Sequence, residues 1–292
     1  MAIDLNKLKE LRERTNSGLL DCRNALEQTN NDIEAAIKYL QEKGIIKAAK
    51  KASRIAAEGI AKAFVKDNLA IIFELNCETD FVAKNKLFLD LADKIQNALI
   101  LANFKNDDEL NKIKINNKTI EELCNDLTAS IGEKITLRRA EKYVANSNEV
   151  VAAYTHADSR IAVIIKAKGN NVEQIRHVAM HIAALNPSYL FECSLPKDLH
   201  DKILSKVEND PKLANKPEKI QASIKSGMLR KEFNDLGVLM FQPFVMDEGK
   251  TVAKFLEDTN LELLEAKRFE VGEGIEKKTV DFATEVAEQM KQ

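Results

Sequence analysis

Residues 76–83 read Asn-Cys-Glu-Thr-Asp-Phe-Val-Ala and join two segments of different pattern. The run before this octet, residues 69–75, is mostly apolar and predicts a buried strand. Residues 87–99 then place apolar side chains at helical spacing, which predicts an amphipathic helix. The octet therefore lies at a strand-to-helix junction, where a rigid scaffold presents a loop. At such a tip, the carboxylate of Asp80 can perturb a charged site and the ring of Phe81 can enter an apolar gap.

Taken alone, the octet has a second interpretation. Thr79 and Asp80 are residue types that commonly cap a helix. Phe81 and Val82 would then be core residues on the first turn of that helix. This interpretation gives the octet a structural role only, so the choice between the two depends on the rest of the chain.

Other segments make the octet part of a longer pattern. They are Leu8–Thr15 (LKELRERT), Asp21–Leu26 (DCRNAL), Ile46–Ala52 (IKAAKKA), Gln242–Met246 (QPFVM) and Arg268–Gly274 (RFEVGEG). Together with the octet, these segments resemble the elongation factor Ts family, the guanine-nucleotide exchange factors of bacterial protein synthesis. The matches follow the family's order and cover essentially the whole chain.

One departure from the family pattern lies near the N-terminus. The family usually has Gly-Ala-Gly-Met-Met where residues 16–20 of this chain read Asn-Ser-Gly-Leu-Leu. Asn tolerates the left-handed conformation that a turn requires. Leu19 and Leu20 keep the apolar side chains of the two methionines, although leucine adapts less readily to its surroundings.

Composition sets the class of protein. The 292 residues are 45% hydrophobic and 31% charged, which is typical of a folded chain of two or three domains. The formal net charge of −2 offers no global basic field for nucleic acid. No run approaches a membrane span, and the N-terminus lacks signal-peptide and transit-peptide character, so we expect a cytoplasmic protein. The four cysteines form no CxxC pair, which fits a reducing compartment and argues against a zinc ribbon.

Residues 4–44 predict three short helices with one apolar face each. Asp32 is placed to cap the third helix, and Gly44 is placed to end it. Such a bundle resembles a ubiquitin-associated (UBA) domain, which would serve either folding or docking. The positions expected on the apolar faces are Leu5, Leu8, Leu11, Leu19, Cys22, Leu26, Ile33, Ala36, Ile37 and Leu40.

An internal repeat follows the three helices. Residues 63–73 and 153–165 each predict two short strands around a polar turn, and an amphipathic helix follows each pair. Between the repeats, Thr119 starts a capping box, and Gly132 ends the helix that follows it. Two related α+β subdomains are therefore expected.

The C-terminal third has a different pattern. Two narrow apolar stripes predict an antiparallel helical hairpin over about 196–235. We therefore expect an α+β fold of three parts, with a UBA-like module and linker first, then an N-terminal core subdomain and a C-terminal core subdomain. The last part carries the hairpin and ends in a helical module at about 275–292. The expected boundaries are 1–54, 55–145 and 146–292.

Motifs for nucleotide binding and covalent catalysis are absent from the sequence. It contains no GxxxxGK[ST] loop, GxGxxG turn or GxSxG elbow, so we expect no enzyme, no cofactor and no direct nucleotide binding. His177 and His181 have the i, i+4 spacing of zinc ligands, but no third ligand follows them. We therefore expect no metal, and interpret them as satisfied or partner-facing histidines. His156 is either a solvated turn residue or, as the resemblance implies, a partner contact.

The resemblance implies a partner, the GTPase elongation factor Tu. It implies that Phe81 wedges between elements of the GTPase domain and that Asp80 disturbs the groups around Mg²⁺, so that GDP leaves. We expect no membrane partner and no specific nucleic acid, and a dimeric or 2:2 complex stays open. The contact residues we expect are Thr79, Asp80, Phe81, Val82, Leu19, Leu20, Ile131, Gly132, His156, Val245 and Met246.

Two other classes of function stay open. A helical adaptor or chaperone would use the three-helix module and the hairpin, and its binding would ignore the partner's nucleotide state. A nucleic-acid or ribosome-binding factor would use a basic stripe on the linker helix, and its binding would depend steeply on salt. This stripe is otherwise a solvated face, because no aromatic residues accompany it for base stacking. It consists of Lys47, Lys50, Lys51 and Arg54.

Overall fold

The computed structural model describes residues 3–15, 17–104, 107–214 and 216–276. Helices and strands are mixed along the chain, so the α+β class predicted from the sequence is confirmed. The chain divides into two compact units. Unit 1 comprises Met1–Ile60, Glu74–Arg139 and the chain from Val271, and unit 2 comprises Ala61–Phe73 and Ala140–Glu270. The helical module expected at 275–292 falls almost wholly outside the described residues.

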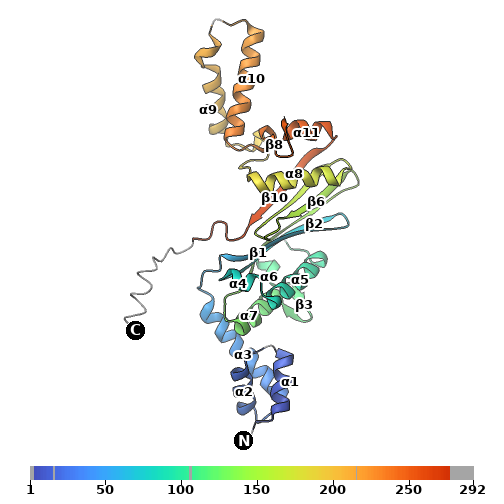
Figure 1. Ribbon diagram of the computed structural model, residues 1–292, viewed down its shortest axis with the longest axis vertical. Helices are drawn as coiled ribbons and strands as arrows, with labels where there is room; N and C mark the ends of the chain where they lie inside the picture. The colour runs from blue at the N-terminus through green and yellow to red at the C-terminus, as the bar shows by residue number, and fades with distance from the viewer. Residues whose placement is uncertain (1–2, 16, 105–106, 215, 277–292) are drawn as a thin grey trace, which may run out of the picture. The chain divides into compact units, whose positions relative to one another are not determined.

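Three helices form the N-terminal module of unit 1, drawn in blue in Figure 1. They are α1 (Leu5–Thr15), α2 (Leu19–Gln28) and α3 (Ile33–Lys51). Asp32 caps α3 as predicted, because its side chain accepts a hydrogen bond from the Ala35 N–H. The core of the module is small and consists of Leu11, Cys22, Ala25, Leu26 and Ala36.

Gly44 does not end the third helix, and this prediction was wrong. Helix α3 continues through Gly44 to Lys51. The reason is tertiary packing, because α3 lies against α7 (Ile120–Ile131). A β-carbon added at Gly44 would lie only 3.3 Å from that of Ala129 on α7. The glycine therefore allows a close approach of two helices instead of providing a C-cap.

A sheet and its helices form the rest of unit 1. Strand β2 (Leu69–Cys77) lies between β1 (Glu58–Lys66) and β5 (Thr136–Val144), and the boundary between the two units crosses these strands. As predicted, α7 starts with a capping box at Thr119 and ends at Gly132, which adopts a left-handed conformation with φ of 94°. The other elements of this part are α4 (Asp80–Ala83), α5 (Lys86–Leu101), α6 (Asp107–Asn111), β3 (Lys114–Ile115) and β4 (Lys118–Thr119).

Unit 2 is built on a second three-stranded sheet of order β10-β7-β6. Both neighbouring strand pairs are antiparallel, and α8 packs on β6 and β7. The core between them is made of aliphatic residues such as Ile165, Ile175 and Ile182. The elements are β6 (Glu149–Thr155), β7 (Ile161–Lys168), α8 (Val172–Leu185), β8 (Pro243–Phe244), β9 (Asp247–Thr251), α11 (Val252–Asp258) and β10 (Glu262–Glu270).

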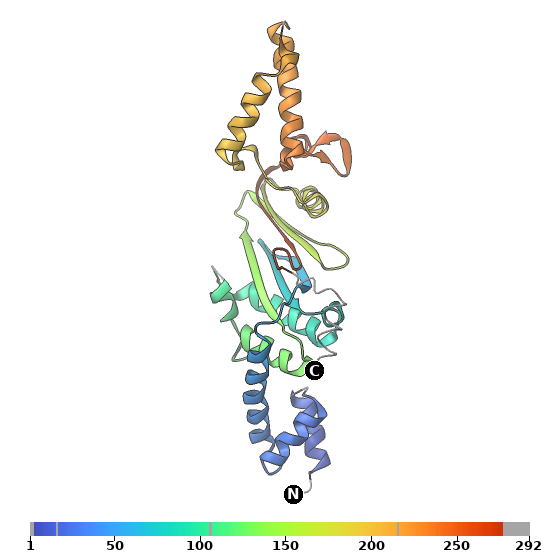
Figure 2. The same cartoon turned by 90° about the vertical axis from the view of Figure 1, so that its left-hand side faces the viewer.

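The predicted helical hairpin also belongs to unit 2. Helices α9 (Lys197–Glu208) and α10 (Glu218–Asp235) lie side by side in both views of the molecule (Figures 1 and 2). Ile203 of α9 and Phe233 of α10 share one buried cluster of the hairpin, and Val207 and Leu213 are buried nearer its tip. Ile220, near the tip, is exposed.

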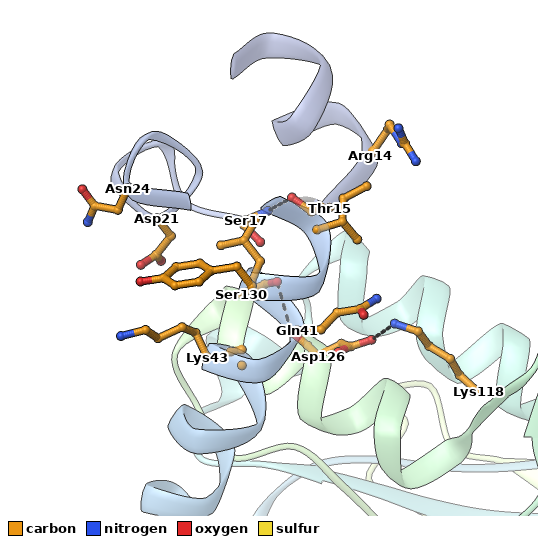
Figure 3. Close-up of a pocket in the computed structure, with 15 residues that line it drawn as sticks. Arg14, Thr15, Ser17, Asp21, Asn24, Gln41, Lys43, Lys118, Asp126 and Ser130 are labelled. Carbon is orange, nitrogen blue, oxygen red and sulfur yellow. Dashed lines mark hydrogen bonds and ion pairs between the residues drawn. The ribbon is translucent and has the colours of Figure 1, made fainter. Parts of the chain in front are cut away.

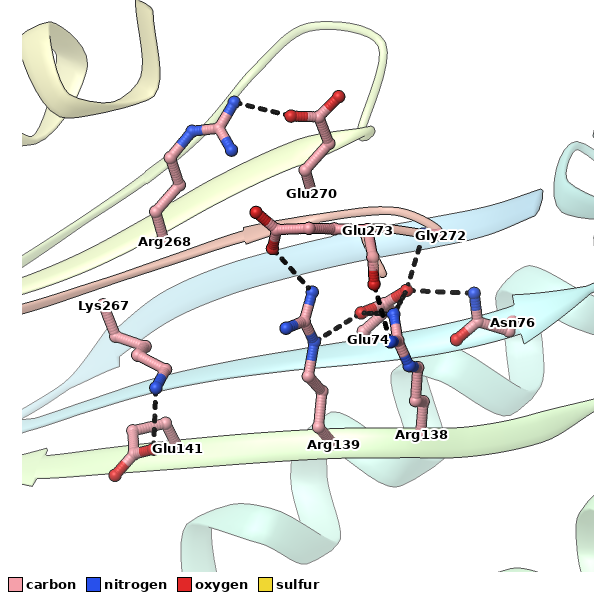
Figure 4. A network of polar contacts seen from close by, with 10 residues as sticks. All are labelled: Glu74, Asn76, Arg138, Arg139, Glu141, Lys267, Arg268, Glu270, Gly272 and Glu273. Carbon is pink, nitrogen blue, oxygen red and sulfur yellow. Dashed lines mark hydrogen bonds and ion pairs between the residues drawn. The ribbon is translucent and has the colours of Figure 1, made fainter. Parts of the chain in front are cut away.

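A buried carboxylate holds three segments of unit 1 together. Glu74, near the end of β2, is fully buried and receives Nη1 of Arg138 at 3.1 Å and Nε of Arg139 at 2.6 Å, both from β5 (Figure 4). It also accepts hydrogen bonds from the Asn76 side chain at 3.0 Å and from the Gly272 N–H at 2.8 Å. Burial opposes its ionisation, but these donors outweigh burial and lower the pKa of Glu74.

Glu74 gives a prediction for stability. In Glu74→Gln, the two arginines lose their buried counter-charge, and we expect the free energy of unfolding to fall by about 3–5 kcal/mol. Urea unfolding at pH 7, followed by circular dichroism, measures this loss. Glu262→Gln is the control, because its pair with Lys168 is largely exposed and should matter by less than about 1 kcal/mol.

The same pair of proteins tests the ionic origin of this stabilisation. Because the folded pKa of Glu74 is lowered, its contribution is present above the unfolded glutamate pKa of about 4.3 and is lost as pH falls through the folded value. The difference between wild type and Glu74→Gln should therefore shrink below about pH 4.3. A difference that stays constant down to pH 3 would show that packing, not charge, explains the loss.

Candidate partner-binding site

Thr79 sets the start of the turn that carries the octet. Its side chain accepts a hydrogen bond from the Val82 N–H, so Thr79, not Asp80, is the N-cap of α4. Just before it, the Cys77 thiol donates to the Thr79 carbonyl over 3.1 Å. Burial raises the pKa of this thiol to about 12, so it stays protonated and can donate.

The two apolar residues of the octet point in different directions. Val82 is buried, with 7% of its surface exposed, whereas Phe81 is 81% exposed. The interpretation of Val82 as a core residue is therefore confirmed, and that of Phe81 as a core residue is wrong. Contact of Val82 with a partner, which we also expected, stays a prediction, and this free chain buries its side chain. The turn presents one large aromatic ring to solvent directly beside a buried anchor.

Asp80 presents a charge next to that ring. Its carboxylate is exposed and pairs with Lys84 one helical turn later, at 2.9 Å. The hydrogen bond from Lys84 lowers the pKa of Asp80, so the group is ionised at neutral pH. The tip of the loop therefore carries a carboxylate and an aromatic ring side by side.

A second loop holds the octet in place. Glu133, between α7 and β5, accepts hydrogen bonds from the Thr79 N–H at 3.0 Å and from the Thr79 hydroxyl at 2.8 Å. In return, Glu78 accepts one from the Lys134 N–H at 2.6 Å. We call these four residues, Glu78, Thr79, Glu133 and Lys134, the clamp. Ile131 and Gly132, predicted as contact residues, directly precede Glu133 and are therefore brought next to the octet.

The sequence did not single out Glu133. Its contact with Thr79 joins residues 54 positions apart, and no local pattern announces such a pair. The one available signal was indirect, since Gly132 was expected to end a helix and Glu133 follows it. The periodicity of apolar residues does not predict the path of the loop after that glycine.

The N-terminal module exposes a group of leucines. Leu20 and Leu5 are 71% and 76% exposed, and Leu19 is also exposed. Sequence periodicity placed Leu5 and Leu19 on apolar helix faces, but both are exposed, because Leu11, Leu26 and smaller residues fill the core. Leu19 and Leu20 were also predicted as partner contacts, and this stays a prediction. The exposed leucines line a shallow hollow of about 440 Å³ together with Ile3, Leu8, Arg23 and Glu27.

The remaining predicted contact residues belong to unit 2. His156 is exposed in the turn after β6, and its Nδ1 lies 2.9 Å from the Asp158 carboxylate. Val245 and Met246 are exposed in the turn between β8 and β9. The structure therefore presents all three to solvent, and their contact with a partner stays a prediction.

His181 contacts the turn between β8 and β9 through a hydrogen bond to its backbone. It is fully buried, and its Nδ1 accepts a hydrogen bond from the Val245 N–H at 3.2 Å. Because Nδ1 accepts, Nε2 carries the proton and donates it to the Gln242 side chain over 3.0 Å. Burial lowers the pKa of His181, which favours this neutral form.

Within the parts of the chain that the structure describes, no group of three or more His, Cys, Asp or Glu side chains could hold a metal ion. Among the helices in those same parts, none combines the length and apolar character needed to cross a bilayer.

A polar hollow of about 320 Å³ lies in unit 1 beside α3 and α7 (Figure 3). Lys118 on its wall pairs with Asp126 at 2.6 Å, and Arg14 pairs with Glu34 at 2.6 Å. Lys43 lies 5.5 Å from the centre of the Tyr39 ring. These cations are already engaged by protein groups, so we assign the hollow no phosphate ligand.

The similarity to known proteins extends over the whole chain. A family model described as Elongation factor TS matches residues 78–273. The chain is 71% identical to elongation factor Ts of Metamycoplasma arthritidis over 292 residues, which is 100% of both chains. It is 52% identical to that of Mycoplasmopsis pulmonis over 285 residues, 97% of each chain. It is 44% identical to that of Mycoplasma mobile over 291 residues, 99% of each.

The environment of His181 gives a second prediction. Its folded pKa lies below the unfolded value of about 6.5, so its neutral form contributes stability above that pH, and this contribution is lost as pH falls. An NMR titration of the histidine ring protons, with His181 assigned through its contact with Phe244, should give a midpoint below about 6.5. A midpoint at or above this value would contradict a neutral His181 whose Nδ1 accepts a hydrogen bond from the Val245 N–H.

Proposed function

Because the chain belongs to the elongation factor Ts family, we propose that it is a guanine-nucleotide exchange factor for the GTPase elongation factor Tu. It acts in the cytoplasm during translation elongation, catalyses no covalent change and binds no nucleotide itself. It acts through thermodynamic linkage. If the chain binds nucleotide-free Tu more tightly than Tu·GDP, then the chain weakens the binding of GDP to Tu. GDP weakens the binding of the chain to Tu by the same factor.

The free energy needed to displace GDP limits which contacts can drive exchange. Moving a population from 1:99 to 99:1 takes about 5.5 kcal/mol of differential affinity. In a GTPase, Mg²⁺ and the phosphate-binding loop hold the nucleotide phosphates, so the differential energy acts there. Mg²⁺ demands near-ideal octahedral geometry, and a small displacement of its ligands is therefore costly.

The exposure of Phe81 is the observation that carries this proposal. The ring is exposed to solvent on a turn that is fixed by the N-cap Thr79 and by the buried Val82, which is the geometry of a wedge. Burying a phenylalanine side chain is worth about 1.5–3 kcal/mol. That is only part of the roughly 5.5 kcal/mol required, so Phe81 does not act alone.

Asp80 supplies the second contribution at the tip. It arrives with the ring as an ionised carboxylate and disturbs the charged groups around Mg²⁺. Once the metal is lost, the diphosphate charge is under-compensated and GDP departs. Thr79 and Val82 support the tip from within this chain, and Ile131 and Gly132 extend the same surface.

Further contacts bring the tip to its target. Leu19 and Leu20 anchor the N-terminal module on the GTPase domain, and the exposed Leu5 enlarges their apolar surface. In unit 2, His156, Val245 and Met246 contact a different domain of Tu. Attachment at two points raises the effective concentration of the wedge at its site without needing a tighter contact there.

The first test removes the wedge. Phe81→Ala should lower the rate of GDP release from Tu by roughly 10- to 150-fold, the equivalent of the lost burial energy. Its stability should change by less than about 0.5 kcal/mol, because the ring is exposed. Stopped-flow release of a fluorescent GDP analogue measures the rate. Leu101→Ala is the matched control, since Leu101 is also apolar and is 88% exposed in unit 1. Equal rates for Phe81→Ala and Leu101→Ala would remove the wedge from the proposal.

The second test removes the charge. Asp80→Asn leaves the Thr79 cap intact, so the fold should be unaffected, while Mg²⁺-dependent exchange should fall about tenfold or more. Chelating Mg²⁺ with EDTA should abolish the difference from wild type, because Asp80 acts through the metal site.

Lys84→Ala is the control for this second test. It removes the partner of Asp80 but keeps the carboxylate, and should exchange at nearly the wild-type rate. A loss in Asp80→Asn that persists unchanged in EDTA would contradict the assigned role.

A further inference from the structure

We propose that Glu133 is a positioning residue for Phe81, acting through Thr79 to fix the tip before it meets the partner. This inference rests on the proposed function, in which the ring of Phe81 enters the GTPase. Glu133 does not need to touch the partner for this role, because both of its carboxylate oxygens already accept hydrogen bonds from Thr79.

The direction of these hydrogen bonds gives Glu133 control over the cap. A threonine hydroxyl has one hydrogen to donate, and a carboxylate can only accept. The hydroxyl of Thr79 therefore donates to Glu133 over 2.8 Å and turns a lone pair toward the Val82 N–H at 3.4 Å. Without Glu133, the hydroxyl is free to rotate, and the cap that orders the turn is weakened.

The loop that carries Glu133 is itself fixed. Lys134 donates its backbone N–H to Glu78, and its Nζ donates to the carbonyl of Ala52 over 2.6 Å. Lys51, at the end of α3, also donates to the Gly132 carbonyl. Glu133 is therefore held on a supported loop, and it can impose a position on Thr79.

The register of the contacts continues from the buried core to the tip. Glu78 lies four residues after Glu74, and its partner Lys134 lies four residues before Arg138, the partner of Glu74. The pairing of Thr79 with Glu133 is the next step in the same series. The clamp thus extends the arrangement that the buried Glu74 establishes between β2 and β5.

Fixing the tip in advance matters because the ring of Phe81 is largely exposed. A tip that must be ordered during binding costs conformational entropy at that moment. A misplacement of about 1 Å at a reacting site can lower a rate about a hundredfold. We therefore expect the clamp to affect the exchange step more than the encounter.

The test is a double-mutant cycle on exchange with elongation factor Tu and a fluorescent GDP analogue. Glu133→Ala should lower the saturating rate of GDP release roughly 10- to 100-fold. The concentration that gives half the maximal rate should change by less than about threefold, because the other contacts remain. In a Phe81→Ala background, the same change should have almost no further effect, since Glu133 acts through that ring.

Glu122→Ala is the matched control. Glu122, in the first turn of α7, accepts a hydrogen bond from the Thr119 N–H at 2.7 Å, so it also joins a carboxylate to a backbone N–H, whereas Glu133 follows the end of that helix. Glu122→Ala should lower stability without changing the saturating rate. Glu133→Gln is a second, milder variant in case Glu133→Ala does not fold, because its amide keeps the size but replaces one of the two oxygens that accept from Thr79 with an NH₂ donor.

Each outcome separates the inference from the function beneath it. Wild type that fails to accelerate GDP release overturns the proposed function. Active wild type with unaffected Glu133→Ala, or unaffected Glu133→Gln where only that variant folds, overturns the inference alone. Losses that multiply in the double variant overturn it too, because Glu133 would then act independently of the ring of Phe81. A rate loss in Glu122→Ala equal to that in Glu133→Ala would reduce the effect to helix stability.

Discussion

The described part of unit 1 depends on a buried negative charge. Glu74 would destabilise β2 if it lacked partners, because removing a carboxylate from water costs several kcal/mol. Two arginines of β5 and the Gly272 N–H satisfy it, and in doing so they fix β2, β5 and the segment after β10 to one another. Gly272 has φ of 77°, and a β-carbon there would lie 2.3 Å from the Ala57 carbonyl, so this contact requires glycine.

The same constraint explains how an exposed ring can be presented rigidly. Since β2 and β5 are held in register at Glu74, the loops that follow β2 and precede β5 meet at the clamp. The N-terminal module has the opposite character. Its core contains mostly small residues, while Leu5, Leu19 and Leu20 lie on its surface. A domain of this size is only marginally stable. Its exposed leucines are therefore consistent with the docking surface that we propose, and covering them would stabilise the module.

Sequence patterns predicted the elements well and their contacts less well. The strand before the octet, the capping box at Thr119 and the hairpin helices were all found from periodicity and cap residues, which are local signals. Gly44 was misjudged because its role depends on Ala129, far away in the sequence. His181 was interpreted as a satisfied or partner-facing histidine, and it is satisfied by Gln242 and Val245, two partners that no spacing rule relates to it.

The candidate site shows the same division. The resemblance located Phe81 and Asp80, but periodicity could not say whether Phe81 faced the core or solvent, because the first turn of a short helix has too few residues to define a face. Leu5 and Leu19 illustrate a related limit, since an apolar stripe looks the same whether it packs internally or against a partner. Glu133 required the fold itself, because its contact is set by strand register.

In the proposed function, binding of this chain to elongation factor Tu and binding of GDP oppose each other. Calorimetric titration of the chain into nucleotide-free Tu, and into Tu saturated with Mg²⁺ and GDP, measures that opposition directly. We expect GDP and Mg²⁺ to weaken the binding of this chain by about 10⁴-fold, the factor that corresponds to about 5.5 kcal/mol. Equal affinities in the two titrations would contradict it and would favour a helical adaptor that ignores the nucleotide state of its partner.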